Sequence, residues 1–289
     1  MGRETSAGGP VAAAMSIDVE DWFHVANLEP AVPRETWSER ELRVERNTDR
    51  LLELLGDAGA RSTCFVLGWV AERRPQLVRR IADAGHEIGS HGFWHQPLPE
   101  LAPAEFREDV RRSKVLLEDL AGSPVRGYRA PSFSITEWAI PILQDLGFAY
   151  DSSVFPTVAH DRYGKLEAVS GEATLLELRP GFHEVCISSL RVGSQPLPWG
   201  GGGYFRLLPY AVFRRGVIRI LNSGAPYVFY IHPWEIDPGQ PRVKGLSPLA
   251  RFRHYVGLGR AEDRFRSLVS DFRWTAIADL LPDEAGASR

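Results

Sequence analysis

Cysteine is scarce in this chain, which has only Cys64 and Cys186 among its 289 residues. So low a number excludes a small fold held together by several disulfides, and we expect both thiols to be buried and free. Long apolar runs are also missing, because no stretch approaches the roughly 20 residues of a membrane-spanning helix. The short apolar segment 11–17 leads straight into acidic residues and not into a signal-peptide cleavage site, so we expect a cytoplasmic protein.

A basic tract is absent as well. The 34 Lys and Arg residues nearly balance the 37 Asp and Glu residues, and the formal net charge is −3. Because no cluster of Lys and Arg is long enough to follow a phosphate backbone, we do not expect a nucleic-acid partner. The glycine run Gly200–Gly203 lacks the Lys-Ser/Thr pair of a phosphate-binding P-loop, and we interpret it as a mobile substrate loop.

The chain does have a core-forming composition, since hydrophobic residues make up 44% of it. That is enough for one large α/β domain. Up to about residue 150, short apolar strands alternate with amphipathic helices, which predicts a parallel sheet or barrel. We expect strands at residues 11–19, 62–67, 86–90 and 125–129. Helices are expected from a cap at Asn47 to Gly59, from Pro75 to Gly85, from Pro103 to Leu120, and from a cap at Thr136 to Gly147.

The second half of the chain has a weaker pattern. Residues 155–198 show no clear period, an apolar strand returns at residues 227–231, and residues 251–281 look helical in part. We expect residues 1–10 to be disordered and residues 11–289 to form a single domain. Its motif-bearing part would span about residues 11–237, followed by a C-terminal extension at residues 238–289.

Acidic and imidazole side chains follow two of the expected strands. Asp18 and Glu20 share one face of the first strand, whereas Asp21 would lie on the other face. Such a pair can supply a general base and a metal ligand, or the strand can simply end in solvated acids. His91 and His95 have a spacing that brings both rings together, and with one carboxylate they would hold a divalent ion such as zinc.

Three further strand ends carry groups that suit the same chemistry. Arg129, ahead of Pro131 and Ser132, is always charged and could hold a carboxylate in place. His232 ends the strand at residues 227–231 and is either a buried core histidine or a general acid working near neutral pH. Asp151 ends another short apolar stretch. Active-site groups gather at the strand ends of parallel barrels, so we expect these clusters to meet.

Taken in order, these motifs resemble those of the NodB-homology polysaccharide deacetylases, also called carbohydrate esterase family four. The resemblance covers about residues 11–237 and implies a distorted (β/α) barrel that removes N-acetyl groups from amino sugars of a polysaccharide or lipid-linked glycan. The implied cofactor is a divalent metal ion, and Zn²⁺ is the ion that we expect. Four phrases are similar to a bacterial subgroup associated with exopolysaccharide and exosortase gene clusters, namely Asp18–Phe23, Gly201–Pro209, Phe229–Asp237 and Phe252–Val256.

The resemblance also implies catalytic roles. Asp18 would be the base that activates water, and His232 the general acid that protonates the leaving amine. Arg129 would orient Asp18, and Asp151 would tune the catalytic histidine. The turn at Pro131–Ser132 would provide a backbone N–H that helps to stabilise the oxyanion.

The implied metal ligands are His91 and His95 with one acid. Members of the family commonly have two adjacent aspartates, whereas this chain has Asp-Val-Glu-Asp, so the acidic ligand is Glu20 or, alternatively, Asp21. Strand geometry favours Glu20. The Ser or Thr that usually follows the first ligand histidine is Gly92 here.

Three other functions are compatible with the same residues. A metal-free hydrolase of a small cyclic amide would be indifferent to chelation. An O-deacetylase would use the same site on an ester. A carbohydrate-binding protein without activity would bind an N-acetylated oligosaccharide and release no acetate.

Overall fold

The computed structural model describes residues 13–155, 164, 166–169, 173–193 and 195–282. The disorder expected for residues 1–10 lies outside the described residues. Within the described ranges, no helix combines the length and the apolar character needed to cross a bilayer. Both Cys64 and Cys186 are buried and free, as predicted.

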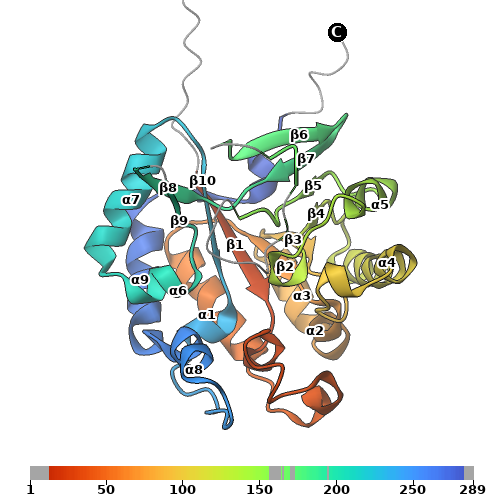
Figure 1. Cartoon of the computed structure of the whole chain (residues 1–289), viewed down its shortest axis with the longest axis horizontal. Coiled ribbons are helices and arrows are strands. Elements are labelled where there is room, and N and C mark those ends of the chain that lie inside the picture. Colours follow the sequence, from red (N-terminus) through yellow and green to blue (C-terminus); the bar gives the residue numbers. More distant parts are fainter. Residues whose placement is uncertain (1–12, 156–163, 165, 170–172, 194, 283–289) are drawn as a thin grey trace, which may run out of the picture.

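A curled, mostly parallel sheet forms the centre of the fold (Figure 1). Its strands run in the order β10-β1-β2-β3-β4-β5-β7-β6, and β11 also pairs with β1. These pairings are parallel except that of β6 with β7, and β8 and β9 form a separate antiparallel ribbon. The strands are β1 Ala13–Val19, β2 Thr63–Val66, β3 Glu87–Ser90, β4 Gly127–Tyr128, β5 Tyr150–Asp151, β6 Leu175–Arg179, β7 Phe182–Val185, β8 Ser189–Val192, β9 Gln195–Pro198, β10 Tyr227–Ile231 and β11 Trp274–Thr275.

Helices surround this sheet, as the alternating pattern of the first half predicts (Figure 1). They are α1 Val44–Asp57, α2 Gly68–Arg73, α3 Pro75–Asp83, α4 Pro103–Ala121, α5 Ala139–Asp145, α6 Gly202–Leu207, α7 Tyr210–Asn222, α8 Pro248–Tyr255 and α9 Leu258–Asp271. All residues of β1 and β10 are buried, which is typical of strands covered on both faces.

The sheet curls into a half-barrel, so the predicted distorted (β/α) barrel is confirmed. Its regular ladder ends at β10 on one side and β6 on the other. The chain after β7 connects the β10 side of the sheet with the segment after β5. The N–H of Ser188 donates to the carbonyl of Val228 in β10 at 3.2 Å, and the N–H of Ile187 donates to the carbonyl of Val154 at 3.0 Å. These contacts bring β10 close to the far side of the sheet.

Two predicted helix caps are wrong. Helix α1 begins one turn earlier than expected, after Arg43, so Asn47 lies inside the helix and donates its side-chain amide to Asp237 at 3.1 Å. The cap of α5 is Trp138, and Thr136 contributes only its backbone carbonyl to the preceding turn. At α1, tertiary contacts of Arg43 with Asp21 and Asp237 accompany the earlier start, whereas a capping residue is a purely local signal. The predicted starts of α3 at Pro75 and α4 at Pro103 are confirmed.

The interpretation of Gly200–Gly203 as a substrate loop is right in its place, because Gly201, Gly202 and Gly203 line the cleft described below, but the segment is not a loop. Gly202 and Gly203 form the first turn of α6, and Gly201 pairs with Tyr230 of β10. A Cβ atom at Gly201 would overlap the carbonyl oxygen of Tyr230, and the φ of Gly201 is +136°. Glycine is required here because two backbones approach closely, which gives a packed segment.

Candidate metal and catalytic site

The predicted site residues that follow β1, β3 and β10 converge on one cleft. The cleft has a volume of about 680 Å³, and its walls include Asp18, Glu20, His91, His95 and His232. The parallel register pairs Ile17 with Ile231, so the next residues, Asp18 and His232, leave neighbouring strands at the same level. Strands from the two ends of the chain therefore build one site at the carboxyl edge of the sheet.

Glu20, His91 and His95 form a buried cluster suited to a metal ion. One ligand atom from each lies within 4.8 Å of the other two. The Oε2 atom of Glu20 is 2.7 Å from Nε2 of His95 and 4.0 Å from Nε2 of His91, yet it has no partner with hydrogen-bond geometry. Two imidazoles and one carboxylate leave further coordination positions open, as catalytic divalent sites require. The donor set therefore fits a catalytic divalent ion.

The orientation of His91 supports this assignment. Its Nδ1 lies 2.8 Å from the carbonyl oxygen of Arg129, which can only accept, so Nδ1 carries the proton. The lone pair of Nε2 then points toward the cluster, as in metal sites where the second ring nitrogen binds a carbonyl. Burial lowers the pKa of His91 to about 4, although the nearby acids oppose this effect. A neutral ring is the form that binds a metal.

The segment between the two histidines is held from α4. Both carboxylate oxygens of Asp109 accept backbone N–H groups, from Phe93 at 2.7 Å and from Trp94 at 3.1 Å. Gly92 has a φ of +70°, and a Cβ atom there would lie 3.0 Å from the Asp109 carboxylate. Glycine at this position therefore permits the tight turn that presents His95.

Asp18 is fixed by a fully buried arginine. The Nη1 atom of Arg129 donates to Oδ1 of Asp18 at 2.6 Å and to Oγ of Ser16 at 2.8 Å. Its Nε and Nη2 donate to the carbonyl and hydroxyl of Ser152 at 2.8 and 2.9 Å. The second carboxylate oxygen of Asp18 remains directed at the cleft, 3.8 Å from Nε2 of His232. This geometry presents one oxygen of Asp18 to a bound water or substrate.

The predicted turn after Arg129 carries unusual backbone geometry. Ser132 and Phe133 have φ values of +54° and +57°, and His95 has +53°. They are the non-glycine residues with positive φ in the described part of the chain, and all three line the cleft. Each such conformation costs on the order of 1–3 kcal/mol and persists only where its surroundings impose it. Pro131 starts this turn and packs near Gly92.

His232 is held by an acid that the sequence analysis missed. The Nδ1 atom and the backbone N–H of His232 donate to Oε1 of Glu235 at 2.8 and 3.1 Å, so Nε2 faces the cleft, 3.5 Å from Oε1 of Glu20. Burial alone would lower the pKa of His232, but the hydrogen bond to Glu235 and the surrounding negative charges raise it to about 9. The ring is therefore protonated at neutral pH, as a general acid requires.

Arg206 positions Glu235 in turn. Its Nε donates to Oε2 of Glu235 at 2.7 Å, and both side chains are buried. The remaining N–H groups of Arg206 donate to the carbonyls of Arg253, His254 and Val256. Although burial of Glu235 would raise its pKa, the charge of Arg206 and the contact with His232 hold the pKa below its usual value. Arg206 thus binds Glu235, and Glu235 in turn binds His232.

We expect Glu235→Gln to lower the pKa of His232 by about one to three pH units, because the amide keeps the acceptor oxygen and removes the charge. His232 would then lose its proton at a lower pH than in the wild type, where its pKa is about 9. Histidine NMR titration of chelator-treated protein measures this directly. Glu100→Gln, on an exposed surface, is the control. An unchanged titration of His232 would show that Glu235 does not set its charge.

Asp151 does not have the predicted contact with His232. Its carboxylate accepts the hydroxyl of Ser153 at 2.6 Å and the N–H of Ser153 at 3.2 Å. Its carboxyl group lies against the carboxyl group of Glu184 in β7, and burial raises the pKa of both. The tuning contact belongs to Glu235, so the prediction for Asp151 is corrected. The order of motifs along the chain pointed to the acid that ends β5 and could not reveal an acid in the 3-10 helix after β10.

Asp21, the alternative acidic ligand, lies apart from the metal cluster. Its carboxylate accepts the N–H groups of Trp22, Arg43 and Val44 at 2.9, 2.6 and 2.9 Å, and thereby binds the start of α1. Burial raises the pKa of Asp21 to about 6 despite these hydrogen bonds. These three partners are backbone N–H groups, and such contacts are typical of an acid at the start of a helix.

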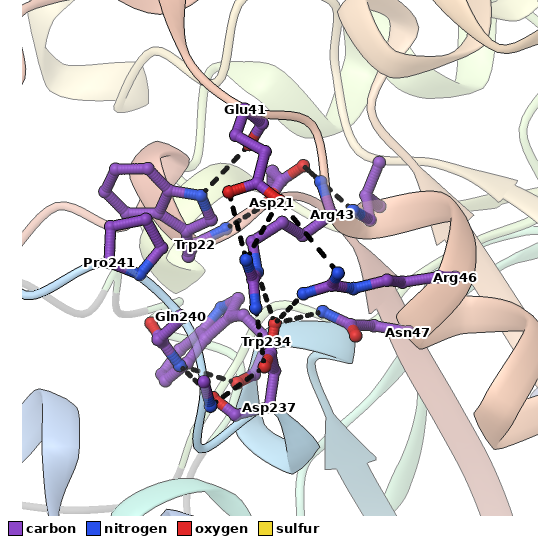
Figure 2. A network of polar contacts seen from close by, with 12 residues as sticks. Asp21, Trp22, Glu41, Arg43, Arg46, Asn47, Trp234, Asp237, Gln240 and Pro241 are labelled. Carbon is purple, nitrogen blue, oxygen red and sulfur yellow. Dashed lines mark hydrogen bonds and ion pairs between the residues drawn. The ribbon is translucent and has the colours of Figure 1, made fainter.

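The same region clamps the loop that follows His232, as Figure 2 shows. The guanidinium of Arg43 donates to both oxygens of Asp237 at 2.7 and 3.1 Å, and Arg46 and Asn47 add contacts at 3.2 and 3.1 Å. Asp21 thus serves the site indirectly, by fixing the start of the helix whose side chains hold the His232 loop. The three acids of the Asp-Val-Glu-Asp motif have three different surroundings.

Comparison with known proteins identifies two regions of the chain. Residues 37–150 match the family "Polysaccharide deacetylase", and residues 152–282 match "Domain of unknown function (DUF3473)". A peptidoglycan-N-acetylglucosamine deacetylase of Bacillus cereus is 27% identical over 47% of this chain and 52% of its own length. A peptidoglycan deacetylase of Helicobacter pylori is 36% identical over 36% of each chain. The chain thus spans about a third to a half of the length of these relatives.

Solved structures share the whole fold at low identity. A Mycobacterium smegmatis protein provisionally classed as a polysaccharide deacetylase superposes with a TM-score of 0.64 at 20% identity, covering 96% of this chain and 91% of that one. A family 4 carbohydrate esterase of Streptomyces lividans gives 0.51 at 14% identity, covering 92% and 91%. A family 4 pseudoenzyme of Bacillus anthracis gives 0.52 at 14% identity, covering 96% and 68%. The chain therefore has the fold of these carbohydrate esterases, and its residues 37–150 match the polysaccharide deacetylase family.

Proposed function

We propose that this protein hydrolyses the N-acetyl amide of amino sugars in a glycan, with a divalent ion bound by Glu20, His91 and His95. The observation that carries the proposal is the convergence of this cluster with Asp18 and a protonated His232 in one cleft. Fold alone does not decide activity, because a pseudoenzyme shares the architecture. The chemistry must be argued from the site.

Amide hydrolysis needs help at both ends of the scissile bond, since the carbonyl is a poor electrophile and the amine a poor leaving group. A bound divalent ion would polarise the carbonyl and lower the pKa of water. Asp18, held by Arg129, accepts the proton of the attacking water through its free oxygen. His232 then donates the proton on Nε2 to the departing nitrogen, and its Nδ1 stays bound to Glu235.

The ion itself is Zn²⁺ in our proposal, because two imidazoles and one carboxylate are a common catalytic zinc set. For the substrate we propose a polysaccharide or lipid-linked glycan of exopolysaccharide synthesis. Among similar proteins, one is named a chitooligosaccharide deacetylase and another a probable 4-deoxy-4-formamido-L-arabinose-phosphoundecaprenol deformylase. These names indicate that both oligosaccharide and lipid-linked substrates occur among the relatives. Phe133, Tyr204 and Trp234 line the cleft and offer faces for sugar rings.

Acetate release from N-acetylglucosamine oligomers, with zinc added or removed, tests the function. We expect release to depend on the metal and to stop in its absence. Activity that is indifferent to chelator would contradict the metal-dependent mechanism. If the protein binds the oligomers and never releases acetate, it is a binding protein and the proposal is wrong.

The ligand assignment has its own test. We expect Glu20→Ala and His91→Ala to weaken metal binding by more than about 100-fold, which exceeds the cost of losing an outer-shell partner. Asp21→Ala should retain the metal, because the Asp21 carboxylate binds backbone groups at the start of α1. Elemental analysis after dialysis measures the metal, and circular dichroism checks the fold. Metal loss in Asp21→Ala alone, with the fold intact, would reverse the assignment.

A further inference from the structure

The segment 238–260 is positively charged. It contains Arg242, Lys244, Arg251, Arg253 and Arg260 and no Asp or Glu, whereas the whole chain has a net charge of −3. All five side chains are exposed. None has a carboxylate of the described residues within ion-pair distance, although most arginines elsewhere in the structure do. Unpaired cations on one segment leave a local positive field.

Large apolar side chains are exposed in the same place. Leu249 and Phe252 of α8 are 57% and 53% exposed, and Leu207 of α6 is 51% exposed. Leu249 and Phe252 lie three residues apart, so they share one face of α8. Single exposed apolar residues are common, but this group coincides with the unpaired cations. Aliphatic and aromatic side chains flanked by arginine are typical of helices that lie in a membrane interface.

The inner side of α8 is firmly anchored, so its outer face has a fixed position. The ring of His254 is buried and stacks on Trp234 with a centroid distance of 4.6 Å, and its Nε2 lies 2.7 Å from the side-chain oxygen of Gln240. Arg206 binds the carbonyls at the end of the helix. Leu249 and Phe252 are therefore exposed on a helix that already has its packing partners.

The outer face of α8 adjoins the catalytic cleft. Phe252 and Val256 line both the cleft and a neighbouring hollow of about 460 Å³, which Arg251 and Tyr255 also line. Arg242 lies over the ring of Tyr255 at 4.2 Å. In Figure 1, α8 projects from the end of the fold toward which the β1 arrow points, where the site lies. A surface that binds α8 would therefore lie beside the cleft entrance.

We propose that Arg242, Leu249, Arg251, Phe252 and Arg253, hereafter the α8 surface, dock the protein on an anionic membrane. The guanidinium groups would contact lipid phosphates, and Leu249 and Phe252 would enter the acyl boundary. A nucleic acid or a charged glycan would satisfy the cations but would leave the aliphatic side chain of Leu249 without a partner. A lipid surface satisfies both kinds of group. Docking would place the cleft next to glycans that are carried at the membrane.

Co-sedimentation with vesicles tests the α8 surface without any substrate. We expect the full chain to bind phosphatidylcholine vesicles that contain phosphatidylglycerol, to bind pure phosphatidylcholine poorly, and to be released by salt. Arg251→Glu and Leu249→Glu should each weaken binding on the order of tenfold. Arg79→Glu on α3 and Val115→Glu on α4 are matched controls, because both residues are exposed and lie outside α8.

The outcomes separate docking from catalysis. Neither Leu249 nor Arg251 lines the catalytic cleft, so both variants should retain activity on soluble oligomers. His91→Ala should still bind vesicles, even if it is inactive. Equal binding to both kinds of vesicle, or equal losses in the α8 variants and their controls, would overturn the proposal. Weakened binding of a soluble anionic glycan with unchanged vesicle binding would make the α8 surface a glycan site and would also overturn it.

Discussion

Replacing Asp18 by asparagine is expected to lower kcat by about 10²–10⁴-fold, the range over which a general base contributes to catalysis. Asparagine keeps the acceptor for Arg129, whose buried charge would otherwise lose its carboxylate contact at 2.6 Å. Asparagine preserves this hydrogen bond but removes the counter-charge, whereas alanine would remove both, so asparagine is the milder change and circular dichroism checks that the fold persists. Acetate release per bound metal is the measurement.

The base assignment requires that metal binding survive in Asp18→Asn. Asp18 is not part of the cluster of Glu20, His91 and His95, so the metal content should match that of the wild type. Asp21→Asn is a matched control, because it removes a charge three residues away and its amide oxygen can still accept the Arg43 and Val44 N–H groups at the start of α1. If Asp18→Asn retains nearly full activity, another group takes the proton from water.

His232→Gln should have an effect of similar size, and the effect should depend on the leaving group. Protonation matters most for a basic leaving amine, so we expect a loss of about 10²–10⁴-fold on N-acetylated sugars. An activated aryl acetate has an aryloxide group that leaves without being protonated. His232→Gln should therefore hydrolyse it at nearly the wild-type rate. Comparing the two substrates on one enzyme preparation separates acid catalysis from a general loss of structure.

The contact between Glu235 and His232 also predicts how the rate depends on pH. Glu235 and the other acids raise the pKa of His232 to about 9 in the metal-free site, and a bound divalent ion would lower it from there. The wild-type rate should therefore fall as the pH rises through the pKa that His232 has in the metal-bound enzyme. A group with a raised pKa keeps its proton below that pKa and loses it above. An equal loss of rate on the amide and the aryl acetate in His232→Gln would contradict the role of His232 as the proton donor.

The first half of the fold was predictable because local signals and tertiary structure agree there. Strands β1 and β2 are short apolar runs, and the helices that begin at Pro75 and Pro103 lie before and after β3. In the second half, the strand predicted at residues 227–231 is confirmed as β10. Residues 155–198 gave no clear prediction, because β8 and β9 form a ribbon away from the main sheet and β9 contains Pro196 and Pro198. Prolines and partial exposure removed the alternation that marks a strand.

The site was predictable in its strand-end residues and not in its supporting contacts. Asp18, Glu20 and His232 were found because they interrupt apolar strands, and the structure brings them together. Glu235 was missed because it lies in the 3-10 helix after β10 and contacts His232 across one turn. An acid three residues after the histidine is the local signal that could have revealed it. Nothing local marks Arg206, whose partner lies 29 residues away.

Because β1 pairs with β10, the strand bearing the catalytic base is synthesised long before the strand bearing the general acid. Until residues 227–231 leave the ribosome, β1 has an unpaired edge whose residues are destined for complete burial. Open apolar edges of this kind favour aggregation. A nascent or truncated chain would therefore be both catalytically silent and dependent on protection by chaperones, and the proposed hydrolytic activity would arise only when β10 pairs with β1.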